Sequence, residues 1–290
     1  MTRSVFLLAL VGCNQAFGLD DTRLVDAGHP FFDAPADAPP ACGAPSEAPS
    51  FDQEFHQAVF ADQQCSQYQT SVAGVALAVC RSPSKFALFE GPVGPLNGMT
   101  LAKGDVAAPS GGAIYGIGLA PEGSEAYIAQ YDIPTNTSAV KHYRRDATGT
   151  WLFQDTLPVT FMSGQKMTGV SRGPHRHLMV VESNYVVREW KSDDNGLWTE
   201  AGTYAATDFG TTIIYSLDLT ADGLRVMLYA QDPQGQFTGY YAYRNTIDER
   251  FGSSVEIPSA PKATDIFLSP DCDRMYFSGV GAVFYVRRLP

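Results

Sequence analysis

A short hairpin unit recurs along this chain and constrains the fold more than any other feature. In each copy, a run rich in Val, Ile, Tyr, Phe and Leu passes through a turn of Pro, Asp or Gly into a second apolar run. Such turns between β-forming runs are typical of tight hairpins. The turns lie near Pro83, Pro121, Pro174, Ala221 and Pro270. These five turns predict five copies of one supersecondary unit.

A second unit follows the hairpin. Residues 143–151 and 190–198 both place Asp-x-x-Gly-x-Trp after a strand with a basic end. A looser counterpart at residues 243–251 ends on Phe251. Each full copy then has four strands, and the copies recur at intervals of roughly 40–55 residues. Four short strands at this interval are typical of a propeller blade.

The last two copies resemble the repeat of the TolB-like, WD-type propeller family, Leu-Ser-Pro-Asp followed by Tyr-Phe. The matching segments are residues 268–271 with 276–277, and residues 219–223 with 228–229. Cys272 stands where that family has Gly. The resemblance covers about residues 73–290. It implies an all-β propeller, and the five turns predict about five four-stranded blades in residues 51–290.

The last copy leaves room for only three strands after its turn near Pro270. We expect its fourth strand to come from residues 51–68, where residues 55–60 alternate between polar and apolar side chains. This arrangement would close the ring with an N-terminal strand. It would also cover sheet edges that otherwise invite aggregation.

The N-terminus has the pattern of an export signal. Arg3 precedes an apolar run at residues 5–11, which is shorter than the roughly 20 residues of a membrane-spanning helix. Residues 10–13, Leu-Val-Gly-Cys, resemble the bacterial lipobox. The resemblance implies a signal peptide at residues 1–12 and palmitate-type lipid on Cys13, anchoring the chain to a membrane. An ordinary signal with a chance cysteine is the alternative.

A tether is predicted at residues 13–50. Its part from residue 20 onward is rich in Pro, Ala and Asp. Because proline fixes φ and removes a backbone donor, helix and central strand are both disfavoured, and a semi-extended spacer is expected. Such a spacer would hold the folded part away from the lipid bilayer of the bacterial cell envelope, at the outer membrane or the periplasmic face.

Four further cysteines are expected to form disulfides in this compartment: Cys42, Cys65, Cys80 and Cys272. Four cysteines allow three pairings, and free buried thiols are the alternative. Cys80 with either Cys65 or Cys272 is favoured, since Cys65 is near Cys80 in the sequence and Cys272 is expected at an equivalent turn of the neighbouring blade. Cys42 could join the tether to the folded part.

The charge balance restricts the partners. The chain has 20 Lys and Arg against 31 Asp and Glu, a net charge of −11. Because such a surface repels phosphate backbones, nucleic acid is excluded as a partner. The sequence has no Cys-x-x-Cys pair, phosphate-cradling glycine loop or calcium loop, so no cofactor or metal is expected. A monomer is expected.

Two patterns that carry catalysis or metal binding in other proteins are interpreted as structural. Residues 169–173 fit Gly-x-Ser-x-Gly, but the strand-then-helix context of a nucleophile elbow is missing. His175 and His177 could hold a metal ion from one strand face. No neighbouring carboxylate or cysteine is indicated, so exposed turn histidines are expected.

The tryptophans are expected to pack between blades rather than stack on sugar: Trp151, Trp190 and Trp198. Residues 192–198 resemble the aspartate box of sialidase propellers, one residue short. In those propellers the box is a structural turn. The resemblance implies that Asp193 and Gly196 set a turn here.

Four carboxylates lie near the start of copies, where innermost strands line the channel: Asp105, Asp208, Asp218 and Asp265. A pair about 5–10 Å apart could hydrolyse a glycoside. Solvated surface charge is the default interpretation.

The sequence therefore favours a non-catalytic envelope lipoprotein whose propeller binds a protein or glycan through its channel face. The resemblance to the TolB-like family favours a protein partner. One alternative is a glycan-hydrolysing propeller that uses channel carboxylates. Another is a purely structural envelope protein, which would lack a concave polar pocket.

Overall fold

The computed structural model describes the chain from Cys42 onward, with gaps. The residues outside this description are 1–41, 53, 55, 59–64, 83–84, 95–97, 107–111, 133–136, 161–165, 171–175, 184, 194, 258–264, 280–281 and 290. The predicted signal peptide (1–12), the anchor Cys13 and most of the tether therefore lie outside the described residues. All described residues belong to one compact unit, Pro40–Pro290.

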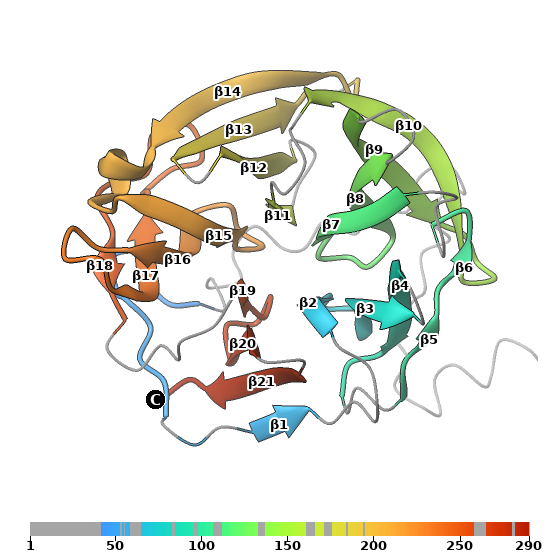
Figure 1. Cartoon of the computed structure of the whole chain (residues 1–290), viewed down its shortest axis with the longest axis horizontal. Helices are drawn as coiled ribbons and strands as arrows, with labels where there is room; N and C mark the ends of the chain where they lie inside the picture. Colours follow the sequence, from blue (N-terminus) through green and yellow to red (C-terminus); the bar gives the residue numbers. More distant parts are fainter. Residues whose placement is uncertain are drawn as a thin grey trace, which may run out of the picture. The chain divides into compact units, whose positions relative to one another are not determined.

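Small antiparallel sheets form the five blades of an all-β propeller (Figure 1). Blade 1 consists of β2 (Cys65–Thr70), β3 (Val75–Ser82), β4 (Lys85–Pro92) and β5 (Thr100–Leu101). Blade 2 consists of β7 (Gly112–Leu119), β8 (Glu125–Asp132), β9 (Thr137–Arg145) and β10 (Thr150–Thr160). Blade 3 consists of β11 (Lys166–Val170), β12 (His177–Ser183), β13 (Val186–Ser192) and β14 (Trp198–Ala205).

The remaining blades complete the ring. Blade 4 consists of β15 (Ile213–Leu219), β16 (Arg225–Gln231), β17 (Phe237–Tyr243) and β18 (Val255–Glu256). Blade 5 consists of β19 (Asp265–Leu268), β20 (Arg274–Gly279), β21 (Ala282–Arg287) and β1 (His56–Ala58). A short strand, β6 (Lys103–Gly104), runs parallel to β10, and a bridge between Ile117 and Thr168 joins blades 2 and 3. The predicted all-β propeller of five blades is confirmed.

The ring closes as the sequence predicts. β1 pairs antiparallel with β21, so that His56 lies opposite Tyr285 and Ala58 opposite Val283. Upstream of β1, Phe51 forms a further bridge with Arg288. An N-terminal strand thus supplies the fourth strand of blade 5 and covers its open edge.

The turn between the first and second strands has the same geometry in blades 4 and 5. In blade 4, the Thr220 hydroxyl donates to Asp222 at 2.6 Å, and Asp222 accepts from the amide of Leu224 at 3.0 Å. In blade 5, the Ser269 hydroxyl donates to Asp271, which accepts from the next turn amide. The repeated Ser/Thr-x-Asp sequence therefore fixes the turn through side-chain hydrogen bonds to the backbone.

Cys272 has a backbone conformation that the other repeats give to glycine. Its φ is +57°, against +69° at Gly223 and +76° at Gly123, and it is the one non-glycine with positive φ among the described residues. A side chain in this left-handed region costs about 1–2 kcal/mol. Cys272 forms a disulfide with Cys42. The residue that replaces the glycine of the repeat is therefore bonded covalently to a residue far upstream in the chain.

The structure corrects the predicted register of blade 1. β3 ends at Ser82 and β4 begins at Lys85, so the turn near Pro83 joins the second and third strands. The first strand is β2, and the turn that follows it spans residues 71–74. Cys80 therefore lies within β3, and the expectation that Cys80 and Cys272 occupy equivalent turns is wrong. Both kinds of turn use Pro, Ser and Gly, so composition does not reveal which strands a turn connects.

The apolar core lies between neighbouring blades. Trp151 is fully buried in a cluster shared by blades 1 and 2. Trp198 is buried between blades 2 and 3, with Trp190 packed against the same cluster. Phe251 takes the corresponding place between blades 3 and 4. The predicted packing role of the tryptophans is confirmed.

The turn expected from the aspartate-box resemblance is also present. The Asp193 carboxylate accepts from the amides of Asn195 at 2.9 Å and Leu197 at 2.8 Å. Gly196 has a φ of +77°, which glycine adopts without strain.

Among the described residues, no helix has the length and apolar character needed to cross a membrane.

Candidate functional site

The innermost strands converge at the centre of the ring (Figure 1). Residues of β2, β7, β15 and β19 line a cavity of about 20 Å³ there, which we call the axial cavity. Roughly 10–15 Å³ is enough to hold one water molecule, so the axial cavity has room for about one species of that size. Of the four carboxylates expected along the channel, Asp218 and Asp265 line it.

Asp218 is held inside the protein by a relay of amide groups. Its side chain is buried, and Oδ1 accepts from Gln69 Nε2 at 3.2 Å. The Gln69 Oε1 in turn accepts from the backbone amide of Leu119 at 2.5 Å. Burial raises the pKa of Asp218 well above its ordinary value, with the backbone amide of Leu268 acting in the opposite direction. Desolvation therefore disfavours the charged form of this carboxyl.

Asp265 has more contact with solvent. It is half-buried at the start of β19, and its Oδ2 accepts from the Ser278 hydroxyl at 3.1 Å. Asp265 and Asp218 thus share one cavity, but that cavity has no room for a sugar ring.

The other two expected channel carboxylates lie elsewhere. Asp105 is exposed just after β6. Asp208 lies in a short 3₁₀ turn, η2 (Ala206–Phe209), where it accepts from the Ala205 amide at 3.0 Å and from Arg250 at 3.3 Å. Both occur in connections between blades, so closeness to the start of a repeat did not indicate closeness to the axis. The prediction that Asp105 and Asp208 line the channel is therefore wrong.

A larger groove of about 400 Å³ lies between blades 1 and 2. We call it the blade 1–2 groove. Four of its lining residues are glycines, Gly74, Gly91, Gly98 and Gly149, which contribute no side chains to fill it. Ligand-binding pockets typically measure about 300–1,000 Å³. The sequence analysis did not find this groove, because its walls come from turns far apart in the chain.

Charged side chains form the floor and rim of the groove. The Glu90 carboxylate pairs with Arg145 at 2.6 Å and accepts from the indole Nε1 of Trp151 at 2.7 Å. Lys103 is exposed on the rim and forms no ion pair with any described residue. Leu101, beside it, is 47% exposed. The groove therefore offers one uncompensated cation next to an apolar side chain.

The same arginine–glutamate pair recurs between blades 3 and 4. The Arg145 amide donates to the turn carbonyl of Ser124, and the Arg244 amide donates to that of Leu224, which is the same turn position. Arg244 pairs with Glu189 at 2.9 Å, as Arg145 pairs with Glu90. The basic strand ends noted in the sequence are thus contacts between consecutive blades, a role that the sequence alone did not reveal.

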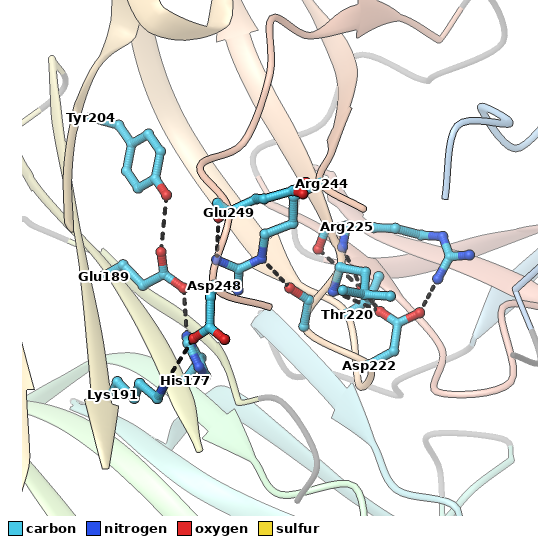
Figure 2. Close-up of polar contacts among 12 residues, drawn as sticks. His177, Glu189, Lys191, Tyr204, Thr220, Asp222, Arg225, Arg244, Asp248 and Glu249 are labelled. Carbon is cyan, nitrogen blue, oxygen red and sulfur yellow. Dashed lines mark hydrogen bonds and ion pairs between the residues drawn. The ribbon is translucent and has the colours of Figure 1, made fainter. Parts of the chain in front are cut away.

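Figure 2 shows the pair between blades 3 and 4 with its neighbours. Glu189 also contacts His177 Nδ1 at 2.6 Å and accepts from the Tyr204 hydroxyl at 3.0 Å. Burial alone would raise the pKa of Glu189, but the bonds from His177 and Arg244 hold it below its ordinary value. Arg244 stacks over the Phe251 ring, with 4.4 Å from Cζ to the centroid. This cluster joins the two blades, and none of its members lines the axial cavity or the blade 1–2 groove.

The histidine prediction is corrected by this arrangement. His177 is 2% exposed and lies in β12, so it is not an exposed turn residue. Nothing in the sequence around His177 indicated its partner Glu189, which lies on the neighbouring strand β13. His175 and residues 171–173 of the Gly-x-Ser-x-Gly match lie outside the described residues.

The end of the tether is fixed to the ring. Cys42 forms a disulfide with Cys272, and the carbonyl of Gly43 accepts from Arg225. The Tyr241 hydroxyl donates to the carbonyl of Pro45. The tether therefore meets blades 4 and 5 on the side that carries the turns between first and second strands.

The second disulfide lies within blade 1. Cys65 and Cys80 face each other across β2 and β3 and are bonded. Of the two favoured partners of Cys80, the structure has Cys65. The pairing of Cys80 with Cys272 does not occur.

No protein family and no curated protein matches the chain. Among solved structures, TolB from Acinetobacter baumannii is similar with a TM-score of 0.51 at 10% identity, over 79% of this chain and 56% of that one. A functionally unknown protein from Desulfotomaculum acetoxidans has a TM-score of 0.47 at 13% identity, with 80% and 71% covered. A protein from Lactobacillus plantarum has a TM-score of 0.44 at 16% identity, with 80% and 72% covered.

This chain spans little more than half the length of the Acinetobacter protein. At such identities the likeness shows the fold alone, a β-propeller.

Proposed function

We propose that this chain is a membrane-anchored, non-catalytic lipoprotein of the bacterial cell envelope whose propeller binds a protein or glycan partner. It acts as a monomer. The observation that carries the proposal is the difference in volume between the two cavities described above. The blade 1–2 groove measures about 400 Å³ and the axial cavity about 20 Å³. A partner group therefore fits at the rim, between blades, and not on the axis.

The disulfides support an envelope location. Disulfides form and persist in oxidising compartments, including the bacterial periplasm and the cell surface. One bond joins the tether to blade 5 and the other joins two strands of blade 1. Together with the lipobox-like segment ending at Cys13 and the proline-rich spacer, they fit a domain held at a membrane by its N-terminus.

The two alternatives have less support. Glycoside hydrolysis requires two carboxylates that flank a sugar, and Asp218 and Asp265 enclose a space of water size. A purely structural protein would have no concave polar pocket, whereas the blade 1–2 groove is concave and lined by charged side chains.

Replacement of the lipidated cysteine tests the anchor. We expect the wild-type chain to be labelled by radioactive palmitate in bacteria and to enter the detergent phase. Cys13→Ser should be unlabelled and enter the aqueous phase, since several acyl chains are needed for stable anchoring. Continued partitioning of Cys13→Ser into detergent would contradict a lipid anchor.

A photo-crosslinking amino acid tests the groove as the binding site. Leu101 in β5 and Val255 in β18 occupy the outermost strands of blades 1 and 4 and are 47% and 50% exposed. In living cells, the probe at Leu101 should give a discrete crosslinked product with a protein or glycan. The probe at Val255 should give none. Equal products at both positions, or none at Leu101, would count against the groove.

A further inference from the structure

The blade 1–2 groove carries more positive than negative charge. Its described lining residues include two cations, Lys103 and Arg145, and one carboxylate, Glu90. The chain as a whole has a net charge of −11. Because complementary charge guides partners to each other, a local excess of positive charge on so acidic a protein favours the approach of a negatively charged group at this place.

The one carboxylate of the groove is already bonded on both oxygens. Glu90 Oε1 accepts from Arg145 Nε at 2.8 Å, and Oε2 accepts from the Trp151 indole at 2.7 Å. The Glu90 side chain is only 14% exposed. Glu90 therefore neutralises Arg145, and Lys103 is left as a charge with no ion pair in the part of the chain that the structure describes.

Arg145 keeps a donor for a further group. Its contacts with Glu90 use Nε and Nη2, and Nη1 bonds to no described residue. The Arg145 side chain is 32% exposed, so this nitrogen is open to a ligand. The guanidinium is planar and is held in place by Glu90, which suits it to a carboxylate. Lys103 and Arg145 thus offer two positive groups in one groove.

The open edge of blade 1 borders the same groove. β5 is the outermost strand of that blade, and its residue Leu101 lines the groove. The Ala102 amide donates to the Leu88 carbonyl at 3.0 Å. Because hydrogen-bonded and non-hydrogen-bonded pairs alternate along antiparallel strands, Leu101 and Phe89 form a non-hydrogen-bonded pair. The amide and carbonyl of Leu101 therefore point to the open edge, where an extended peptide could pair with them.

The lining suits a peptide better than a sugar. No aromatic side chain occurs among the described lining residues, so a sugar ring has no ring to stack on. The Leu101 side chain is 47% exposed and lies beside Lys103. In an extended peptide, side chains two residues apart lie on the same face. One acidic side chain can then reach Lys103 while an apolar one covers Leu101.

We propose that the blade 1–2 groove binds an extended acidic segment of a partner protein. The segment pairs with the edge of β5 and places an Asp or Glu side chain against Lys103 and Arg145. This inference rests on the proposed function and narrows it, because it makes the partner a protein and not a glycan.

The photo-crosslinking amino acid at Leu101 tests this chemistry when it is combined with charge variants in living cells. Mass spectrometry should find a peptide of another protein attached at residue 101, with an Asp or Glu about two residues from the crosslinked position. Lys103→Glu should lower the yield about tenfold and Lys103→Gln about threefold, because the first reverses the charge and the second removes it. Arg287→Glu is the matched control, since Arg287 is exposed in β21 and lies outside the groove. It should leave the yield unchanged.

The outcomes separate this inference from the proposed function. An unchanged yield in Lys103→Glu would overturn the acidic segment and leave the groove as the binding site. A glycan attached at residue 101, a second copy of this chain, or this chain's own tether would overturn it as well. The absence of any product at Leu101 would instead contradict the groove itself.

Fluorescence anisotropy with the purified full-length chain in non-ionic detergent gives a second measurement. The probe is a dye-labelled peptide Thr-Val-Glu-Val-Glu-Val-Thr with an amidated C-terminus, and the control peptide has Gln in place of each Glu. The acidic peptide should bind at least about tenfold more tightly than the control, and salt should weaken its binding. Lys103→Glu should remove this preference, and Arg287→Glu should retain it. Equal binding of both peptides, or a preference unaltered in Lys103→Glu, would overturn the proposal.

Discussion

Two kinds of contact hold the blades together, and they differ between the middle of the chain and its ends. Blades 1 and 2, like blades 3 and 4, are joined by an arginine–glutamate pair at one repeated position, which is buried between blades 3 and 4 and half-buried between blades 1 and 2. Where blade 5 meets blade 1, that position holds Tyr285 and Val93 instead. Aromatic rings fill this interface: the Tyr68 and Tyr276 centroids are 4.8 Å apart.

Ring closure also uses contacts outside the interface of blades 5 and 1. β1 adds a strand to blade 5. The Cys42–Cys272 disulfide, which spans 230 residues, fastens the segment before β1 to the same blade, in the cluster that blade 5 shares with blade 4. Consecutive blades form over short sequence distances, whereas ring closure must bring the chain ends together against loop-closure entropy. A covalent bond reduces that entropy in the unfolded chain. The comparison indicates that this propeller secures its middle by paired charges and its ends by a strand and a disulfide.

The largest effect is expected from the closing disulfide. Cys42→Ser with Cys272→Ser should lower the free energy of unfolding by about 4 kcal/mol, because a long loop is released. Removing Cys65 and Cys80 in the same way should cost roughly 3 kcal/mol, since they are 15 residues apart. Urea unfolding of the oxidised proteins would compare the two. A smaller loss at Cys42 and Cys272 than at Cys65 and Cys80 would contradict the account of closure.

A second variant of this cysteine pair measures the cost of the positive φ at residue 272. Cys42→Ser with Cys272→Gly should be more stable than the double serine variant by about 1 kcal/mol, because glycine adopts the positive φ of residue 272 without strain. If the glycine variant is the weaker one, Cys272 is not strained in the way described.

The buried pair in the middle of the chain comes next. Arg244→Met keeps the apolar stem but leaves Glu189 without its arginine, so the free energy of unfolding should fall by about 3 kcal/mol. Lys191→Met is the control at the same interface, since its pair with the exposed Asp248 is screened by solvent and should contribute far less to stability (Figure 2). Similar losses in both variants would show that burial of the pair is not what matters.

The sequence predicted the architecture better than it predicted these contacts between blades. The hairpin repeat and the alternating residues 55–60 indicated the blade number and the closing strand, because both depend on local turn chemistry and period. Glu90 and Arg145 are 55 residues apart, and nothing local marks them as partners. The one feature of the sequence that could have indicated this contact is the Tyr-Arg pair that ends two strands, at residues 143–145 and 243–244. The blade 1–2 groove and the burial of His177 likewise arise only once the blades are packed.

The contact between blades 2 and 3 gives a pH-dependent prediction. Burial alone would raise the pKa of Glu125, but the His142 ring, whose Nε2 lies 3.7 Å from Oε2, and the charge of Arg176 lower it to about 2. A depressed carboxyl pKa adds stability above the unfolded value, and this stability is lost as pH falls through the folded one. Glu125→Gln should therefore cost about 2 kcal/mol at pH 7 and almost nothing near pH 2. Acid and neutral urea titrations would check this, and a loss independent of pH would contradict it.

The smallest effect concerns the two packed tryptophans. Trp151→Phe removes the indole bond to Glu90 and should cost about 1 kcal/mol more than Trp198→Phe, beyond the loss of packing common to both. Trp198 contacts the Tyr127 ring edge-on at 5.4 Å, which Phe largely preserves. Thermal unfolding would compare the stability that each variant loses. Equal losses would mean that the hydrogen bond from Trp151 to Glu90 is weak.

Disulfide mapping by mass spectrometry tests ring closure most directly. The chain would be purified from bacterial envelopes under non-reducing conditions and digested with its bonds intact. The structure predicts peptides that link Cys42 to Cys272 and Cys65 to Cys80, and no link from Cys80 to Cys272. Free thiols at Cys42 and Cys272, or a Cys80–Cys272 peptide, would contradict the account of a ring closed and fastened by its N-terminal segment.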